Sequence, residues 1–188
     1  MAYKTDEEMH GMGFKLLGRN VKISTKASIY NCDQIEIGDN SRIDDFCVIS
    51  GSIHIGRHVH LTPMCLVAGG EKGIFIGDFV TMAYGVKVFS QSDDYSGQTM
   101  TNSTVPGKYK NEYKDRVVIK KHSIIGAGSI VMPGVILEEG VSIGAMTLVT
   151  KNTNPWSIYV GVPARKIKNR SKELLNLVAD FLKNNDSI

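Results

Sequence analysis

The chain has 188 residues, a length that fits one domain with one sizeable core and leaves no room for a second catalytic domain. Apolar residues make up 42% of the chain and charged residues 22%, which excludes a disordered, collagen-like or membrane-spanning protein. The 22 basic and 19 acidic side chains give a net charge of +3, too even a balance to indicate a nucleic-acid partner.

The N-terminal residues 1–13 are polar and acidic, and the chain contains no run of about 18 apolar residues. We therefore expect neither secretion nor a membrane partner. Cys32, Cys47 and Cys65 form no CxxC pair, so neither a disulfide framework nor a thiolate zinc site is indicated. These features predict a cytoplasmic protein.

In chain order, residues 1–20 are expected to form an N-terminal helix and cap. The stretch from Thr5 to Glu8 fits a capping box, in which the threonine hydroxyl and the glutamate carboxylate satisfy each other's backbone N–H groups. A short helix should follow it.

A repeat of six residues then begins. Aliphatic side chains recur at every sixth position in three phased blocks: Ile37, Ile43, Ile49, Ile55, Leu61 and Val67; Ile76, Met82 and Val88; Ile119, Ile125, Val131, Leu137, Ile143 and Val149. A sustained period of six fits neither a helix nor a single alternating strand. Three short strands per coil, one for each hexad, would stack each aliphatic residue on the one three hexads later, at about 4.8 Å. The pattern predicts an all-β solenoid, a parallel β-helix over residues 21–168, with Cys47 stacked on Cys65 as packed thiols.

Two breaks interrupt the repeat. Three residues are inserted between Val67 and Ile76, and about 25 residues are extruded between Val88 and Ile119 as a polar loop over residues 90–116. A loop of that length inside a compact domain is usually functional or disordered. Its tyrosines and lysines favour an ordered arm that packs on a neighbouring subunit.

The third block repeats small residues at one outward position, because Ala127 and Ala145 are three hexads apart and each follows a glycine. Such a stripe leaves a shallow channel in which a long, narrow ligand can approach the backbone. Five cations then lie within residues 165–172, and apolar residues recur at helical spacing from Lys172 to Asn184. We expect residues 169–188 to form a C-terminal helix that caps the last coil.

The hexads, together with the Gly-Val-Pro-Ala-Arg-Lys-Ile segment at residues 161–167, resemble the left-handed β-helix (hexapeptide-repeat) acyltransferase family. The resemblance implies a left-handed coil, a homotrimer with active sites between subunits, and acetyl-CoA or another acyl-CoA as co-substrate. It also implies that the coenzyme is held by Ala127, Ala145, Thr150, Lys151, Arg165 and Lys168.

The galactoside- and maltose-type members carry a catalytic histidine at the start of the loop, where this chain has Asp93 followed by Asp94. An alcohol needs a base to attack a thioester, whereas an unprotonated amine already has a free lone pair. Residues 43–47, 69–71 and 93–97 resemble the N-acyltransferases of the anthrose-pathway type, which acylate a dTDP-linked 4-amino-4,6-dideoxy sugar. That resemblance implies N-acylation for a cell-surface polysaccharide, with Asp93 or Asp94 positioning the amine and Glu71 and Tyr95 binding the acceptor.

Two other functions stay open. The first is sugar O-acetylation of the galactoside or O-antigen type, with Asp93 or His60 as the base. The second is a non-catalytic scaffold or a metal protein similar to γ-class carbonic anhydrases. His54 and His60 are one hexad apart and so fall on successive corners of the coil, which argues against a shared metal ion.

Overall fold

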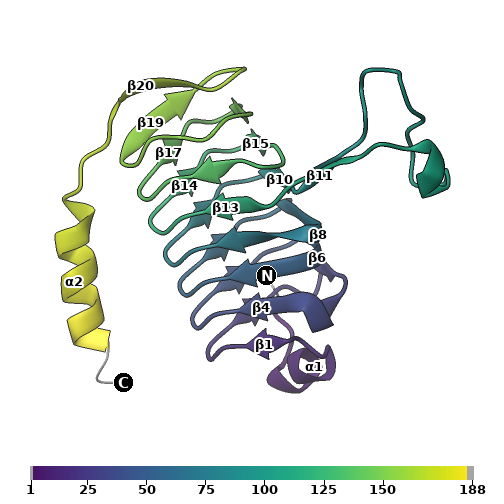
Figure 1. Ribbon diagram of the computed structural model, residues 1–188. Coiled ribbons are helices and arrows are strands. Elements are labelled where there is room, and N and C mark those ends of the chain that lie inside the picture. The colour runs from purple at the N-terminus through teal and green to yellow at the C-terminus, as the bar shows by residue number, and fades with distance from the viewer. Residues whose placement is uncertain (1, 186–188) are drawn as a thin grey trace.

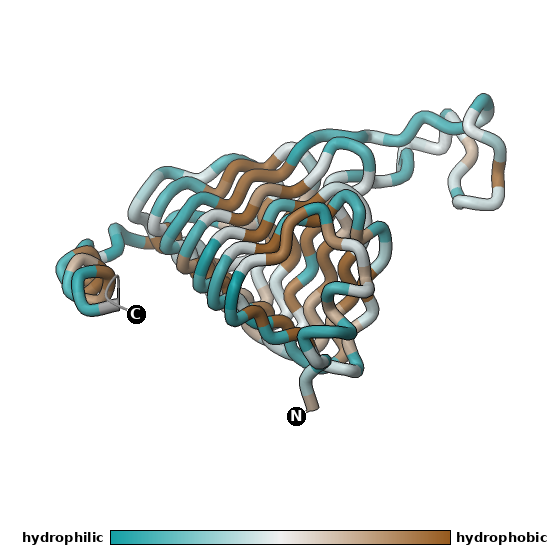
Figure 2. The backbone as a smooth tube through the Cα atoms, turned by 90° about the horizontal axis from the view of Figure 1, so that it is seen from below, coloured by the Kyte–Doolittle hydropathy of each residue, from teal (hydrophilic) through white to brown (hydrophobic). Residues whose placement is uncertain are grey.

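The computed structural model describes residues 2–185, which form a stack of triangular coils followed by a helix (Figure 1). Seen along the stack, the coils superpose into a triangular outline (Figure 2). The parallel β-helix predicted from the period of six is confirmed. No helix within the described residues is long and apolar enough to span a bilayer.

Each coil contributes a short parallel strand to each of three sides. Side 1 contains β1 (Leu16–Leu17), β4 (Ile35–Ile37), the second halves of β6 (Val48–Ile55) and β8 (Leu66–Ile76), β13 (Val117–Ile119) and β16 (Ile136–Leu137). Side 2 contains β2 (Lys22–Ile23), β5 (Arg42–Ile43), β7 (His60–Leu61), β9 (Thr81–Met82), β14 (Ile124–Ile125), β17 (Ser142–Ile143) and β19 (Ser157–Val160). Side 3 contains β3 (Ser28–Ile29), the first halves of β6 and β8, β10 (Lys87–Phe89), β15 (Ile130–Val131) and β18 (Leu148–Val149).

The register reproduces the predicted coil length and both breaks. In regular coils, paired residues are three hexads apart in the sequence, as for Arg42 with His60. The offset in residue number becomes 21 where His60 pairs with Thr81, because three residues are inserted before Ile76. The offset becomes 43 where Ile74 pairs with Val117, because the extruded loop adds its length to that of one coil. In the first coil the offset is 20, since a 3-10 turn, η1 (Cys32–Gln34), lengthens that coil.

The hexad side chains form the core. All fifteen aliphatic residues of the repeat are at most 2% exposed, and so are twelve of the residues that lie four positions after them, from Ser41 to Thr147. Cys47 and Cys65 are among these buried residues, and both are free thiols, as predicted. Burying an aliphatic side chain contributes about 1.5–3 kcal/mol, so the repeat itself stabilises the stack.

The three corners carry different features. Corner A, between sides 2 and 3, contains residues 126–128 and 144–146; corner B, between sides 3 and 1, emits the loop of residues 90–116. Corner C, between sides 1 and 2, carries a column of stacked rings in which His58 lies 4.9 Å from Phe79, and Phe79 lies 5.3 Å from His122. These three residues have positive φ angles, an uncommon conformation for large side chains, which the tight corner imposes.

The ends of the chain differ in part from expectation. Helix α1 (Asp6–Gly11) begins at the predicted capping box, with the Glu8 N–H donating to the Thr5 hydroxyl at 3.2 Å. Coil pairing starts at Leu16–Leu17, inside the segment assigned to the N-terminal cap. The basic segment forms a strand, β20 (Arg165–Asn169), which pairs antiparallel with β19.

Helix α2 (Leu174–Asn185) is present where a C-terminal helix is predicted, but it does not cap the last coil. It runs back along the outside of the stack (Figure 1), and Phe181 meets His58 and Phe79 edge-on at 5.2 and 6.2 Å. The hairpin of β19 and β20 already occupies that end, so the helix instead packs on the ring column of corner C. The last three residues of the predicted C-terminal segment, 186–188, lie outside the described residues.

Candidate active site

The foot of the long loop is a small hairpin. Strands β11 (Gln91–Ser92) and β12 (Tyr113–Lys114) pair antiparallel, and the Asp115 N–H donates to the Ser90 carbonyl at 2.9 Å. Asp93 follows this ladder directly and is partly buried. The predicted acidic pair therefore lies at the base of the loop, close to the coils.

The two aspartates have different surroundings. Asp94 accepts a hydrogen bond from the Ser96 N–H at 2.8 Å and another from the Thr99 hydroxyl at 2.8 Å. These bonds from Ser96 and Thr99 lower the pKa of Asp94 to about 2. Both its oxygens hold the turn that starts the loop, a common role for aspartate.

The Asp93 carboxylate, in contrast, makes no hydrogen bond or ion pair with any residue among 2–185. Its backbone carbonyl accepts a bond from the Ser92 hydroxyl at 3.2 Å, which fixes the main chain at this point. Asp93 is thus the acid of the pair that is available to a ligand, a distinction that sequence reasoning leaves open.

The two expected acceptor-binding residues lie near this foot. Glu71 belongs to the three-residue insertion at corner B, and its carboxylate is 3.8 Å from the Lys114 ammonium of β12. Tyr95 follows the acidic pair and is 91% exposed, so within one subunit it extends into solvent.

His60 lies on side 2 and is not brought near Asp93 within one chain. Its Nε2 is 2.9 Å from Oδ2 of Asp44, a carboxylate whose side chain is 3% exposed. The Arg42 Nε–H donates to the other oxygen of Asp44 at 2.6 Å. A histidine oriented by a buried carboxylate has the geometry of a general base, which keeps His60 in consideration.

The histidines do not gather into a metal site. His54 bonds Glu36 on side 1, His58 stacks on Phe79 at corner C, and His60 bonds Asp44 on side 2. Within residues 2–185 no group of three or more His, Cys, Asp or Glu side chains is arranged to hold a metal ion.

The predicted small-residue stripe lies at corner A. Ala127 and Ala145 occupy equivalent positions in adjacent coils, and the Met146 N–H donates to the Ala127 carbonyl at 2.8 Å. A Cβ on Gly126 would overlap the backbone nitrogen of Ala145, so the glycine lets the two coils touch. Ala127 is half-buried and Ala145 is exposed, which leaves a low, accessible surface.

The remaining coenzyme candidates divide between two corners. Arg165 pairs with Val160 at the end of β19, next to corner A, and Lys168 pairs with Ile158 further along that strand. Thr150 and Lys151 follow β18 and are exposed at corner B. Strand β18 pairs with β15, and β15 pairs with β10, the strand that precedes the loop. Thr150 and Lys151 therefore lie two coils, about 10 Å, from the start of the loop.

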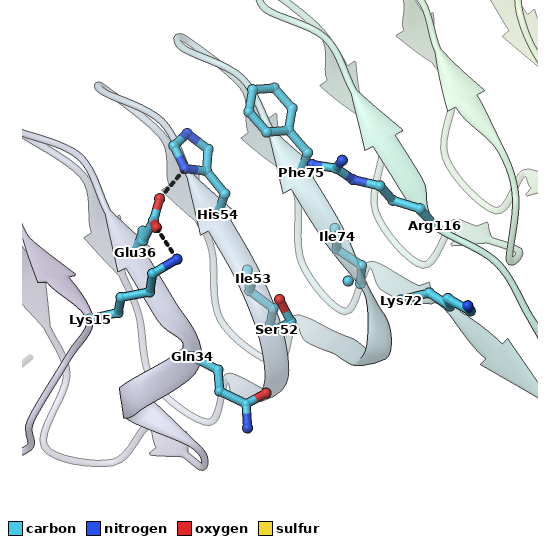
Figure 3. A pocket seen from close by; sticks show the side chains of 11 residues that line it. Lys15, Gln34, Glu36, Ser52, Ile53, His54, Lys72, Ile74, Phe75 and Arg116 are labelled. Atoms are coloured by element: carbon cyan, nitrogen blue, oxygen red, sulfur yellow. Dashed lines mark hydrogen bonds and ion pairs between the residues drawn. The ribbon is translucent and has the colours of Figure 1, made fainter.

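A pocket of about 400 Å³ on side 1 was not anticipated from the sequence. It adjoins the loop foot, and its lining includes Glu36, His54, Lys72, Phe75 and Arg116 (Figure 3). Sequence reasoning missed that His54 and Phe75 are separated by one coil plus the three-residue insertion. This spacing makes them register partners on adjacent coils, where their rings stack.

Comparisons with known proteins identify the family of the chain. The family model described as "Bacterial transferase hexapeptide (six repeats)" matches residues 116–151. The chain is 45% identical over 184 residues, 96% of its length, to the dTDP-4-amino-4,6-dideoxy-D-glucose acyltransferase of Escherichia coli, of which it covers 95%. It belongs to the hexapeptide-repeat acyltransferase family. The resemblance predicted from the hexads and the 161–167 segment is thereby confirmed.

Solved structures support the same family assignment. AntD, an N-acyltransferase from Bacillus cereus in complex with dTDP and 3-hydroxybutyryl-CoA, superposes with a TM-score of 0.95 at 45% identity, with 97% of each chain covered. A variant of AntD in complex with dTDP-4-amino-4,6-dideoxyglucose and coenzyme A gives a TM-score of 0.96 at 45% identity, with 97% of this chain and 98% of that chain covered. A maltose O-acetyltransferase from Clostridium difficile matches at 0.55 and 22% identity over 88% of this chain and 75% of that chain, which shows the shared fold alone.

In the acyltransferase subunit, the predicted site residues thus form two groups. Asp93, Glu71, Tyr95, Thr150 and Lys151 lie along corner B, while Ala127, Ala145 and Arg165 lie at corner A with Lys168 beside them. One subunit alone does not bring the two groups together.

Proposed function

We propose that this acyltransferase moves an acyl group from an acyl-CoA to the amino group of a nucleotide-linked amino-dideoxy sugar, for a cell-surface polysaccharide. The proposal is supported by a similarity to dTDP-4-amino-4,6-dideoxyglucose acyltransferase that runs from end to end of both chains. The observation that carries it is the Asp93 carboxylate, which has no partner among residues 2–185 and stands where other sugar acetyltransferases carry a histidine.

In this reaction the amine nitrogen attacks the thioester carbonyl carbon, the C–S bond breaks, and the amine loses one proton as the thiolate leaves. The attacking nitrogen already has its lone pair, so the protein needs chiefly to hold it in line with the carbonyl. Asp93 accepts a hydrogen bond from the amine, orients it, and takes or relays the proton as the C–N bond forms.

The acyl-CoA lies along corner A in this proposal. Ala127 and Ala145 leave room for the narrow pantetheine chain, and the exposed cations of Arg165 and Lys168 face the phosphates. Thr150 and Lys151 complete the nucleotide end of the coenzyme. Acetyl-CoA is the simplest donor, and a longer acyl chain such as 3-hydroxybutyryl, which AntD holds, is the other.

The working enzyme is a homotrimer in which the loop of one subunit reaches corner A of the next. Exposed apolar side chains on the loop support this arrangement, with Met100 at 55%, Tyr109 at 51% and Tyr113 at 57%. A closed threefold ring would cover them and would join the two groups of site residues. The three free cysteines fit a cytoplasmic location.

A sugar O-acetyltransferase is the second candidate, and the observation in its favour is the pairing of His60 with the buried Asp44 at 2.9 Å. An acceptor hydroxyl placed at His60 would lose its proton to the ring. The scaffold and metal-protein alternatives have no comparable observation in their favour.

The test measures release of free thiol from acetyl-CoA with dTDP-4-amino-4,6-dideoxyglucose and, separately, with the 4-hydroxyl sugar. We expect turnover of the amino sugar only, and a loss of about 10²-fold or more in kcat for Asp93→Asn. Turnover of the hydroxyl sugar alone, lost in His60→Gln and retained in Asp93→Asn, would replace this proposal with O-acetylation. Sedimentation of the pure protein should give three times the subunit mass.

A further inference from the structure

Helix α2 makes its aromatic contact with the coils at corner C, and Figure 2 shows it beside one corner of the triangular outline. Leu175, Val178 and Leu182 of the helix are half-buried, while Leu177 is 71% exposed and Phe181 40%. A helix of 12 residues is marginally stable in water by itself. Helix α2 therefore depends on its contact with the ring column.

The segment that leads into the helix is fixed separately. The Arg170 guanidinium donates to the carbonyls of His122 and Gly140 at 2.8 and 3.0 Å, and the Lys172 ammonium lies 5.8 Å from the centre of the Trp156 ring. These contacts hold residues 170–172 at the end of the stack. The helix can thus leave the ring column while it stays tethered to the last coil.

His58 is the polar group at the centre of the contact. Its ring stacks on Phe79, with centroids 4.9 Å apart and planes within 3°, and meets Phe181 edge-on at 5.2 Å. The ring makes no hydrogen bond or ion pair with any residue among 2–185. A neutral imidazole fits between two phenyl rings, whereas a proton on it would place an unpaired charge under the helix.

The charged groups near His58 on the coils are already paired with each other. Asp78 on the next coil pairs with Arg57 at 3.0 Å, and Asp39 on the preceding coil pairs with Arg19 at 3.2 Å. Burial, and then the Arg57 charge, lower the pKa of His58 more than Asp78 and Asp39 raise it. The surroundings in the coils thus favour the neutral ring.

Helix α2 and the rest of the column add few charges. Asp180 and Lys183 flank Phe181 in the sequence and have opposite signs. His122 stacks on Phe79 at 5.3 Å, and burial, followed by the Lys121 charge, lowers its pKa too. The other charged groups that act on His122 are Glu139, Arg170 and Asp78.

We propose that helix α2 is a pH-sensitive latch, docked on the ring column while His58 is neutral and released when His58 takes up a proton. Release exposes the His58 ring to water, so the released state binds the proton more tightly than the docked state does. The ratio of released to docked helix should rise as the pH falls below about 6.5, by up to about tenfold per pH unit. The aliphatic core excludes His58, Phe79 and Phe181, so the coils stay folded.

The test measures deuterium exchange of the α2 amides at pH 7.5, 6.5 and 5.5, expressed as protection factors so that the intrinsic effect of pH on exchange is removed. In the wild type, α2 protection should fall several-fold, up to about tenfold, from pH 6.5 to 5.5, while the amides of β14 and β17 keep theirs. Phe181→Ala should lower α2 protection at all three pH values.

Two variants at histidines give the matched comparison. His58→Asn removes the titrating ring and suits the corner, because Asn20 and Asn40 hold the equivalent position with φ angles of 55° and 59°. In His58→Asn, α2 protection should lose most of its dependence on pH. His10→Gln changes an exposed histidine of α1 instead and should keep the wild-type dependence.

Three outcomes would overturn the latch. The first is constant α2 protection in the wild type from pH 7.5 to 5.5, and the second is a pH dependence that His58→Asn leaves unchanged. The third is a parallel loss of protection in β14, β17 and α2, which would mean that acid unfolds the whole stack. Corner C carries none of the residues assigned to acyl transfer, so each of these outcomes leaves the proposed function standing.

Discussion

His60 Nε2 and Asp44 share a hydrogen bond of 2.9 Å, and the same carboxylate accepts the Arg42 Nε–H at 2.6 Å while almost fully buried. The two oxygens of this buried carboxylate thus have one partner each, from β5 and from β7, which ties the two neighbouring coils together. The His60 side chain is 36% exposed, so part of its ring faces solvent. The same pair therefore fits either a structural or a catalytic role.

Substitutions at this pair separate the two roles. Asp44→Asn should lower the free energy of unfolding by about 1–3 kcal/mol, a value reduced because Arg42 and His60 are more than a third exposed. His60→Gln should leave kcat with the amino sugar within about threefold of the wild type. Urea unfolding and steady-state kinetics check both values, and a loss of about 10²-fold in His60→Gln would make His60 the base.

The two adjacent aspartates should respond differently to substitution. Asp94→Ala removes both bonds that hold the turn to Ser96 and Thr99, so limited proteolysis should cut the loop faster while the melting temperature of the coils stays nearly constant. Asp93→Asn should leave the proteolysis rate unchanged and lower kcat about 10²-fold or more. Equal proteolysis of the two variants would contradict this division of roles.

The low pKa of Asp94 also sets a pH window. Because the folded-state pKa of about 2 is below the unfolded value of about 3.9, its stabilising effect is complete above about pH 4 and is lost as the pH falls through about 2. The difference in proteolysis between Asp94→Ala and the wild type should therefore be constant from pH 5 to 8.

Corner C should make folding stability depend on pH. Burial, and then the neighbouring Arg57 and Lys121 charges, lower the pKa values of His58 and His122 in the folded state. The unfolded chain then binds more protons just below pH 6.5, so stability should fall as the pH drops through that value. Melting temperatures at pH 7.5 and 5.5 measure the effect.

A matched variant tests whether the histidines cause it. The double change His58→Phe and His122→Phe keeps aromatic rings in the column, and Phe79 already occupies the equivalent corner position with positive φ. The difference between the two melting temperatures should shrink in this variant. An unchanged difference would assign the pH dependence to other groups.

Added bulk in the small-residue stripe at corner A should weaken binding of the acyl-CoA. Ala145→Leu adds bulk on an exposed position, so it should raise KM for acyl-CoA about tenfold and leave the melting temperature unchanged. Leu61→Ala, at a fully buried core position, is the converse control and should cost about 2–5 kcal/mol of stability without a selective effect on KM. An unchanged KM in Ala145→Leu would move the coenzyme away from corner A.

The repeat made the fold readable from the sequence. A hexad series such as Ile37, Ile43 and Ile49 has only one way to bury every member, namely a coil of three hexads, and the register follows by counting. The lengths of the insertion and of the extruded loop follow in the same way, as the offsets of 21 and 43 show. Local periodicity determined these features because neighbouring coils pair with each other and with little else.

Only the tertiary structure decided which outward side chains have a partner and which have none among the described residues. The sequence does not distinguish the roles of Asp93 and Asp94. In the structure they differ because Ser96 and Thr99 donate hydrogen bonds to Asp94. Helix α2 lies beside the coils because β20 already pairs with β19 at the end of the stack. The stacking of the His54 ring on the Phe75 ring arises from pairing across the three-residue insertion. A sequence pattern fixes which side chains point inward, whereas hydrogen bonds and contacts between outward side chains depend on loops and chain ends that follow no period.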